Sequence, residues 1–228
     1  MLETINLYNN FLTGSLPAEM EELKALATIH VSDNLLSHSI PEWLGELPLL
    51  QDIALETNRF TGTIPTSIYN LTLLNVFTLF ENDLTGTLPY QLTQKANKLL
   101  QYLAINFNSL TGTVPADLDN LHIIETFDIK SNFYTGTIPH SVGNTTFMRY
   151  LDLSENLLSG SLPDTLQDLR FIQALFVDEN MLTGSLDKFV NSSKQLIYTN
   201  IDVSNNNFVG KIPVQPFQIK TFETFAGV

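Results

Sequence analysis

The chain has 228 residues, of which 43% are hydrophobic and 15% charged, and its formal net charge is −13. This acidic balance argues against nucleic-acid binding, which needs a basic face, and it is compatible with basic partners. The chain contains no cysteine, so disulfide pairing offers no evidence about the compartment. No apolar run approaches the length of a membrane span and no signal peptide is visible, so we expect a soluble segment without direct membrane insertion.

An asparagine recurs along the whole chain at a nearly fixed interval. Its nine copies are Asn10, Asn34, Asn58, Asn82, Asn108, Asn132, Asn156, Asn180 and Asn206. The interval is 24 residues except after Asn82 and after Asn180, where it is 26. A period in this range is typical of a solenoid, and solenoids present long concave binding surfaces. The sequence therefore predicts one repeat domain over residues 1–228, with binding as its leading function.

The segment 50–74 illustrates the repeat unit. Ile53 and Leu55 alternate with polar residues at period two, which predicts a short strand. Asn58 follows where the chain must turn, and a buried asparagine there can bond backbone groups of its own and of the neighbouring coil. We expect this role for all nine asparagines, whereas a neighbour such as Asn106 is predicted to face solvent.

The second half of the unit predicts another extended segment and a helical turn. Gly62 permits a positive φ, and Pro65 cannot donate to a strand ladder, so the segment ends there. Ile68, Leu71 and Leu74 then follow at intervals of three residues. This spacing suits a short helical turn whose apolar side faces inward.

The motif after each asparagine resembles the plant-type leucine-rich repeat, whose mark is L-T-G-x-I-P. Its copies read TGSLP (13–17), TGTIP (61–65), TGTLP (85–89), TGTVP (111–115), TGTIP (135–139), SGSLP (159–163) and VGKIP (209–213). His38 stands at the glycine position of the second repeat and Asp187 at the proline position of the eighth. The resemblance implies an α/β solenoid, a right-handed superhelix with a concave parallel β-sheet of about nine strands. A second short strand per repeat and short helical or 3-10 turns on the convex side complete the expected unit.

The two longer intervals and the chain ends modify this plan. The extra residues fall in 91–99 and 188–195, which we expect on the outer face, where insertions do not break the stack. The chain begins inside a repeat at Leu2, so we expect no N-terminal cap. Residues 214–228 include the large apolar residues Phe217, Ile219, Phe222 and Phe225. This run resembles the closing segment of plant receptor ectodomains, and we expect it to cover the last coil.

Three N-x-S/T sequences mark candidate glycosylation sites, at Asn70, Asn144 and Asn191. All three fall in predicted outer-face segments. The resemblance implies that the family is often glycosylated at the positions of Asn70 and Asn144.

In the strand pattern L-x-x-L-x-L-x-x-N, the third, fifth, seventh and eighth positions are predicted to face the concave side. Aromatic and acidic side chains gather at these positions in the fourth to eighth repeats. The candidate ligand-binding residues are Phe80, Tyr102, Phe107, Asp128, Tyr150, Asp152, Glu155, Phe176, Asp178 and Glu179. Exposed aromatics form a candidate contact surface. Together these residues predict a protein or peptide partner that is basic and has an apolar anchor.

Other interpretations of the same residues remain open. One alternative for the acidic face is a solvated surface without a partner, and one for the aromatics is a set of cross-strand pairs that stabilise the sheet. Carboxylates could hold calcium, but no calcium-loop spacing is present. The four histidines lie in separate repeats without an accompanying nucleophile. We therefore predict no catalytic residue, no metal site and no cofactor.

A column of hydroxyl side chains raises one further alternative. It consists of Ser15, Ser39, Thr63, Thr87, Thr113, Thr137, Ser161 and Ser185. A regular hydroxyl array could order water, and a plant-type repeat antifreeze protein is a relative within the family. The family consensus carries threonine or serine at this position in any case, so ice binding is a minor alternative.

The resemblance implies a non-catalytic recognition module, all or part of the ectodomain of a receptor-like or secreted protein at the cell surface or outside the cell. The rival reading is a secreted inhibitor of a cell-wall hydrolase, similar to polygalacturonase-inhibiting proteins, which have the same repeat type. A purely structural role would leave the concave face without a specific partner. Fold alone does not choose among these functions.

Overall fold

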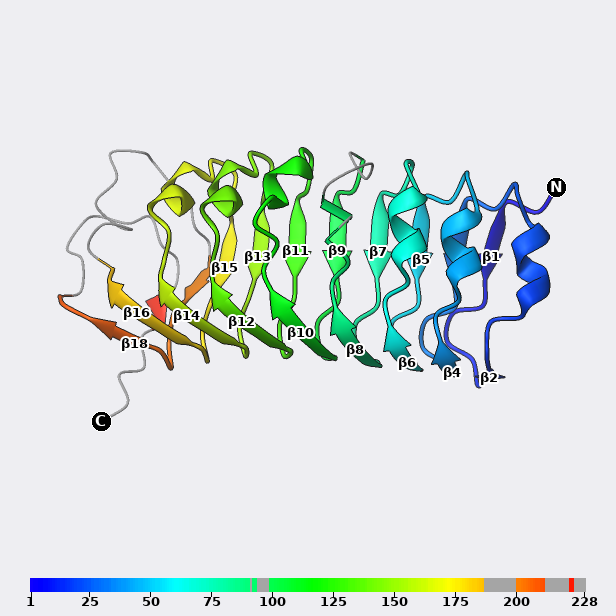
Figure 1. The fold of residues 1–228 in the computed structure, drawn as a ribbon, viewed down its shortest axis with the longest axis horizontal. Helices are drawn as coiled ribbons and strands as arrows, with labels where there is room; N and C mark the ends of the chain where they lie inside the picture. The colour runs from blue at the N-terminus through cyan, green and yellow to red at the C-terminus, as the bar shows by residue number, and fades with distance from the viewer. Residues whose placement is uncertain (91, 94–98, 187–199, 212–221, 224–228) are drawn as a thin grey trace.

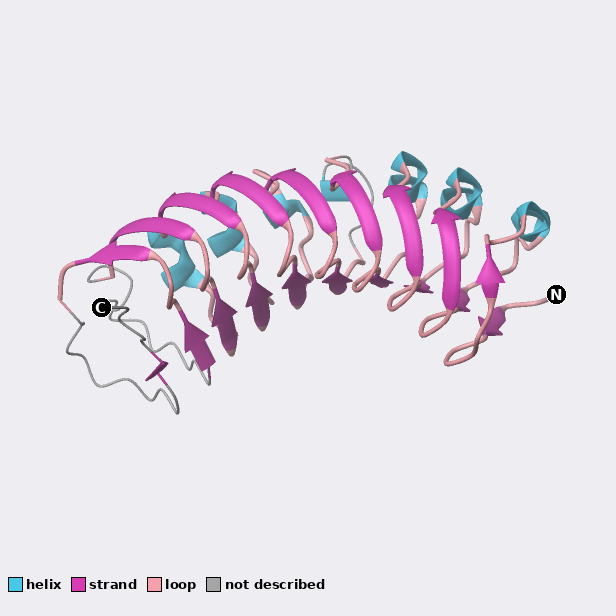
Figure 2. Cartoon of the chain, turned by 90° about the horizontal axis from the view of Figure 1, so that it is seen from below, coloured by secondary structure: helices cyan, strands magenta, loops and turns pink. Residues whose placement is uncertain are grey.

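The computed structural model describes residues 1–90, 92–93, 99–186, 200–211 and 222–223. The chain winds through repeated coils, each with a short inner strand, a second strand and, in most repeats, a 3-10 turn (Figure 1). We number the repeats one to nine by their asparagines. Turned by 90° about the horizontal axis, the stack of coils is an arc with the inner strands on its concave side (Figure 2).

The inner strands have three residues each in the nine repeats and pair in parallel. They are β1 (Thr4–Asn6), β3 (Thr28–His30), β5 (Asp52–Ala54), β7 (Val76–Thr78), β9 (Tyr102–Ala104), β11 (Thr126–Asp128), β13 (Tyr150–Asp152), β15 (Ala174–Phe176) and β17 (Asn200–Asp202). A tenth strand, β19 (Phe222–Glu223), pairs in parallel with β17 and extends this sheet beyond the last repeat. The predicted concave parallel sheet is thus confirmed, with one more strand than the repeat count.

The second sheet follows the T-G-x-I-P motif and also consists of parallel strands. They are β2 (Thr13–Gly14), β4 (Leu35–Ser39), β6 (Arg59–Thr63), β8 (Asp83–Thr87), β10 (Ser109–Thr113), β12 (Phe133–Thr137), β14 (Leu157–Ser161), β16 (Met181–Ser185) and β18 (Asn207–Val209). The convex turns are the 3-10 helices η1 (Ala18–Glu22), η2 (Glu42–Glu46), η3 (Thr66–Asn70), η5 (Leu118–Asn120), η6 (His140–Asn144) and η7 (Asp164–Asp168). Most follow a motif proline directly, because proline suits the extended residue that precedes a helical turn.

Each repeat asparagine from Asn34 to Asn206 bonds backbone groups of two coils, whereas Asn10 bonds carbonyls of its own coil. In the fifth repeat, Asn108 Nδ2 donates to the carbonyls of Leu79, Ile105 and Asn106 at 3.0–3.2 Å. Its Oδ1 accepts the N–H of Leu84 at 3.0 Å. The side chain therefore ties two neighbouring coils together at the point where the chain leaves the inner strand.

The residue before each asparagine has a left-handed backbone, which the sequence analysis did not predict. Its φ lies between 49° and 55° in all nine repeats, with residues as different as Asn9, Thr57 and Phe107 at the position. His38 also has a positive φ, 73°, at the position where other repeats carry glycine. In the preceding coil, the residue opposite this position is Ser15. Glycines opposite a serine have more space for a Cβ atom than Gly86, which lies opposite Thr63. His38 thus keeps the backbone of the motif at the cost of strain.

One continuous hydrophobic core runs through the stack, and its aromatic members include Phe60, Phe77, Phe127 and Tyr134. Tyr134 stands where neighbouring repeats carry leucine or phenylalanine. Its hydroxyl is buried and has no hydrogen-bond partner among the described residues. Burial raises the pKa of this hydroxyl well above its usual value.

Tyr134→Phe should stabilise the protein by about 1 kcal/mol, because it removes an unsatisfied buried hydroxyl and keeps the ring. Urea denaturation of both proteins measures the difference. A loss of stability of similar size would show that the hydroxyl has a partner in solution.

Several predicted features lie outside the described residues. They are the insertion segment 188–195, most of 91–99, Asp187, Asn191, and the closing residues Phe217, Ile219 and Phe225. Of the closing segment, only the backbone of β19 is described. No helix among the described ranges is long and apolar enough to cross a membrane.

Candidate functional site

The concave candidates project from β7, β9, β11, β13 and β15 and from the turns that follow them. The strands are in register, so Tyr102, Thr126, Tyr150 and Ala174 lie in one row across four repeats. The next row toward the asparagines contains Ala104, Asp128, Asp152 and Phe176. The structure thus places these side chains of the candidate set on neighbouring strands.

The aromatic candidates differ in exposure. Tyr102 is 40% exposed and Phe107 is 44% exposed, whereas Phe80 is half-buried. Tyr150 and Phe176 are also half-buried and contact each other, with ring centroids 5.6 Å apart and planes tilted by 57°. This pair spans two adjacent strands and can stabilise the sheet, as the structural interpretation expects.

Phe107 occupies the left-handed position of its repeat, with a φ of 52°. At the other eight copies of this position the residue is polar or charged, and asparagine and aspartate tolerate this conformation best. A bulky aromatic residue there costs backbone energy, yet its ring remains exposed and contributes little to the core. Strain without a packing benefit is a frequent property of functional positions.

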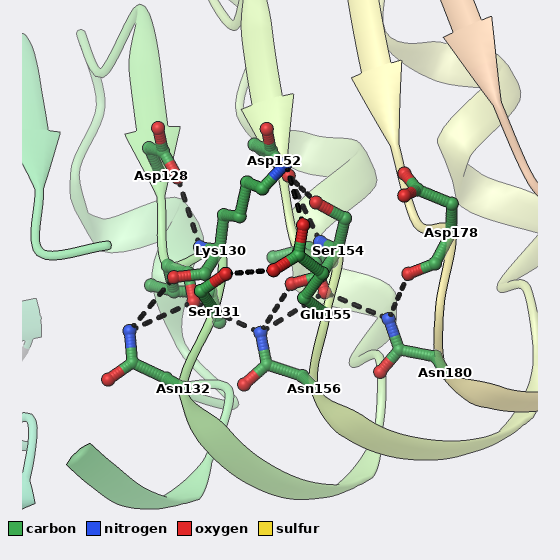
Figure 3. Close-up of polar contacts among 12 residues, drawn as sticks. Asp128, Lys130, Ser131, Asn132, Asp152, Ser154, Glu155, Asn156, Asp178 and Asn180 are labelled. Atoms are coloured by element: carbon green, nitrogen blue, oxygen red, sulfur yellow. Dashed lines mark hydrogen bonds and ion pairs between the residues drawn. The ribbon is translucent and has the colours of Figure 1, made fainter. Parts of the chain in front are cut away.

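A basic side chain crosses the acidic face. Lys130 Nζ lies 2.9 Å from Glu155 Oε1, and it lies 5.9 Å from the centre of the Phe107 ring, within cation–π range. Ser131 donates a hydrogen bond to the other carboxylate oxygen of Glu155. Figure 3 shows Lys130 reaching over this cluster from the sixth repeat to the seventh. Glu155, a predicted ligand-binding residue, is therefore already paired within the chain.

Asp128 and Asp152, at the fifth position of the strand pattern, also accept hydrogen bonds from within the chain. Asp152 Oδ1 accepts the N–H and the hydroxyl of Ser154 at 3.0 and 2.6 Å, and its Oδ2 accepts the Tyr150 hydroxyl at 3.0 Å. Asp128 Oδ1 accepts the N–H of Lys130 at 3.0 Å. Asp152 is only 4% exposed, which leaves it little surface for a partner. These aspartates help to hold the turn after the strand, a role that the sequence reading missed.

The remaining acidic candidates belong to the eighth repeat, where Asp178 is half-buried and Glu179 is exposed. Burial and the charge of Asp202 raise the pKa of Asp178 to about 6. Burial and the charge of Asp152 raise the pKa of Asp128 to about 7, although the Lys130 N–H and ammonium act in the opposite direction. Glu155 behaves differently, because the Ser131 hydrogen bond lowers its pKa against the effect of burial.

Asp128→Asn should therefore raise the free energy of unfolding at pH 8 by about 1–3 kcal/mol. The native carboxyl with its raised pKa holds more protons than the unfolded one between about pH 4 and 7. Wild-type stability contributed by Asp128 thus falls as the pH rises through this window and is constant above it. Asparagine keeps the acceptor for Lys130 and carries no charge.

The measurement is urea denaturation of wild type and variant from pH 4 to 8. Glu155→Gln is the matched control with the opposite sign, because a lowered pKa adds stability at neutral pH that the amide loses. A difference between Asp128→Asn and wild type that is constant over the range would contradict the assignment.

Asn106 differs from its expected position. The sequence analysis predicted a solvent-facing side chain, but its Oδ1 atom is buried and has no hydrogen-bond partner among the described residues. The seventh position of the adjacent coils carries the long side chains of Phe80 and Lys130, and neighbours of this kind are not visible in a single repeat.

Two candidate glycosylation sites lie on the convex side, where Asn70 and Asn144 end η3 and η6 and are exposed. Asn144 Nδ2 donates to Asp119 Oδ2 at 3.1 Å. In the described part of the chain, no group of three or more His, Cys, Asp or Glu side chains is arranged to hold a metal ion.

Comparison with protein families matches the Leucine Rich Repeat model at residues 1–23, 99–121 and 147–169. No curated protein sequence matches the chain. Among solved structures, the chain is similar to the ectodomain of the plant membrane receptor kinase GASSHO1/SCHENGEN3 from Arabidopsis thaliana, in complex with CASPARIAN STRIP INTEGRITY FACTOR 2. The TM-score is 0.84 and the identity 28%, over 91% of this chain and 24% of that one.

Two further solved structures show the same similarity. The Arabidopsis receptor kinase HAESA, in complex with the peptide hormone IDA and the co-receptor SERK1, gives a TM-score of 0.76 at 29% identity, over 91% of this chain and 38% of that one. A plant ice-binding protein gives 0.78 at 26% identity, over 93% of this chain and 67% of that one. The chain thus spans about a quarter to two fifths of the length of the receptor structures. The repeat register and these matches identify the chain as a leucine-rich repeat protein, similar in structure to plant receptor-kinase ectodomains.

Proposed function

We propose that the chain is a non-catalytic module that recognises a protein or peptide, as all or part of the ectodomain of a receptor-like or secreted protein outside the cell. In this proposal residues 1–228 act as one domain, and the partner binds the concave face of the fourth to eighth repeats. The HAESA and GASSHO1/SCHENGEN3 structures contain a peptide hormone and CASPARIAN STRIP INTEGRITY FACTOR 2 respectively, which supports a partner of this class.

The observation that carries the proposal is the exposed aromatic surface around Phe107. Phe80, Tyr102 and Phe107 project from adjacent repeats at positions that the core does not need. Phe107 also holds its ring there at a backbone cost. Buried aromatic anchors carry much of the binding energy in protein interfaces. A partner that covers these rings would gain free energy from the apolar surface that it buries.

The surrounding charge favours a basic partner. Asp178 and Glu179 carry acidic groups toward the same face, while Lys130 is engaged with Glu155. Charges at the edge of an interface mainly set the association rate and the orientation of the partner. We expect binding to weaken as ionic strength rises.

The test is selection of a random peptide library on the immobilised protein, followed by affinity measurement for the enriched peptides. The variant Phe80→Ser/Tyr102→Ser/Phe107→Ser should weaken binding at least tenfold and remain folded, because these side chains lie outside the core. The matched control is Phe133→Ser/Phe147→Ser/Phe171→Ser, which removes three exposed aromatics from other faces. Peptides that bind the first variant as well as wild type, or the absence of any enriched peptide, would overturn the proposal.

Ice binding is a second candidate, favoured by the second sheet. Its T-G-T segments expose hydroxyls on paired parallel strands, where the second threonine of one repeat lies beside the first threonine of the next, as Thr87 beside Thr111 and Thr113 beside Thr135. Thr85, Thr111 and Thr135 each donate to a glycine carbonyl of the preceding repeat at 3.1–3.3 Å, so their hydroxyls share one orientation. The similarity to a plant ice-binding protein supports this candidate.

Inhibition of ice recrystallisation by the purified protein tests it. Thr111→Lys/Thr135→Lys should abolish the inhibition, while Thr28→Lys on the concave sheet should leave it unchanged. A wild-type protein without inhibition would exclude this candidate and would not affect the peptide-binding proposal.

A further inference from the structure

Two tyrosines flank one small residue on the concave sheet. Tyr102 on β9 and Tyr150 on β13 are both paired in register with Thr126 on β11 between them. Neighbouring strands lie about 4.8 Å apart, so the two tyrosine positions are separated by about 9.6 Å. Thr126 has a short side chain and is only partly buried.

Asp128 lies two residues after Thr126 on β11, so both side chains are on the same face of the sheet. Its neighbours in register are Ala104 on one side and Asp152 on the other, and Figure 3 shows the two carboxylates side by side. Burial, followed by the charge of Asp128, raises the pKa of Tyr102. Burial and the charges of Asp152 and Asp128 likewise raise the pKa of Tyr150. The charge of Asp128 thus acts on both tyrosine hydroxyls.

Two contacts hold the Tyr150 side chain in place. Its hydroxyl donates to Asp152 of the same strand, and its ring contacts the Phe176 ring of the eighth repeat. Within the described part of the chain, Asp128 forms no salt bridge. One of its oxygens bonds the backbone N–H of Lys130, while the Lys130 ammonium is directed to Glu155.

We propose that Tyr102, Tyr150 and Asp128 together bind one basic side chain of the partner, an arginine guanidinium or a lysine ammonium group, above Thr126. This inference rests on the proposed recognition function and specifies the chemistry that the concave face selects.

The geometry suits a cation better than a neutral group. A cation above Thr126 would lie about 4.8 Å from the strand of each tyrosine, which brings it within reach of both rings for cation–π attraction, whose range is roughly 6 Å. It would also approach Asp128, which is half-buried and uncompensated by a paired cation. An apolar side chain in the same place would gain the ring contacts but would further bury the carboxylate without a partner, which is unfavourable.

The test uses N-acetyl-arginine amide as the probe and N-acetyl-citrulline amide as its neutral isostere. Both are titrated into the protein at pH 8, above the pKa of Asp128, with the ring resonances of Tyr102 and Tyr150 as the NMR readout. We expect the arginine probe to shift both rings and to bind at least fivefold more tightly than the citrulline probe. Nα-acetyl-lysine amide, titrated in the same way, shows whether the site prefers an ammonium or a guanidinium group.

Two variants examine the assignment. Asp128→Asn should remove the preference for arginine over citrulline, and Tyr102→Leu/Tyr150→Leu should weaken arginine binding at least fivefold. Asp33→Asn and Tyr8→Leu, in the first two repeats of the same face, are the matched controls and should leave both quantities unchanged. Equal binding of the two probes to wild type, or a preference that survives Asp128→Asn, would overturn the inference.

The titration reports on the inference separately from the proposed function. If selected peptides bind the concave aromatics but show no preference for arginine or lysine and tolerate Asp128→Asn, the recognition function stands and this inference fails. If no peptide is selected at all, the recognition function fails, whatever the arginine titration gives.

Discussion

Replacing Asn108 with alanine is expected to lower the free energy of unfolding by about 3 kcal/mol. The change leaves the Leu84 N–H and the carbonyls of Leu79, Ile105 and Asn106 without the side chain that bonds them. Each stranded buried group costs about 1–3 kcal/mol, and relaxation of the turn recovers part of the sum. Urea denaturation followed by circular dichroism measures the loss.

Asn106→Ala is the matched control in the same repeat. The Oδ1 atom of Asn106 is buried and has no partner among the residues that the structure describes. Removing this amide should therefore change stability by about 0.5 kcal/mol or less, or increase it. Equal denaturation midpoints for the two variants would contradict the role assigned to the asparagine row.

Gly143→Ala is the second change with a large expected effect. A methyl group on Gly143 would lie 2.1 Å from the carbonyl oxygen of Thr165 and 2.3 Å from its carbon. These are backbone atoms of the next 3-10 turn, so they cannot move without separating η6 from η7. Overpacking of this kind costs about 1–3 kcal/mol or more, and we expect at least 3 kcal/mol here.

Gly14→Ala is the control that shows the cost of backbone strain without steric overlap. Gly14 has a φ of 85°, but a methyl group there meets nothing within 4 Å. Its replacement should cost only about 1–2 kcal/mol, the penalty of a left-handed alanine. A Gly143 variant that is as stable as the Gly14 variant would show that adjacent convex turns are not tightly packed.

The sequence predicted those features that recur with the same residue type in each repeat. The asparagine spacing gave the number of coils, and the alternation around Ile53 and Leu55 located the inner strands. Gly62 and Pro65 marked the second strand and its end. Each of these positions admits few residue types, because the backbone there needs a specific donor, acceptor or dihedral angle.

Features that depend on adjacent repeats were not predictable in this way. The left-handed position accepts residues from Asn9 to Phe107, so no single residue type marks it. The pairing of Lys130 with Glu155 joins the sixth repeat to the seventh, and the ring contact between Tyr150 and Phe176 joins the seventh to the eighth. The tenth inner strand also follows no repeat pattern. For the candidate site, the sequence located the face and its aromatics, but not which acids are free to meet a partner.

The affinity of a selected peptide for Phe107→Asn tests the central claim most directly. Asparagine tolerates the left-handed backbone that Phe107 adopts and occurs at the same position in the first and ninth repeats. The account predicts a protein that is more stable by about 1 kcal/mol and binds the peptide at least tenfold more weakly. An affinity equal to that of wild type would show that the strained phenylalanine does not contact the partner, and would contradict a binding site on the concave face at the fifth repeat.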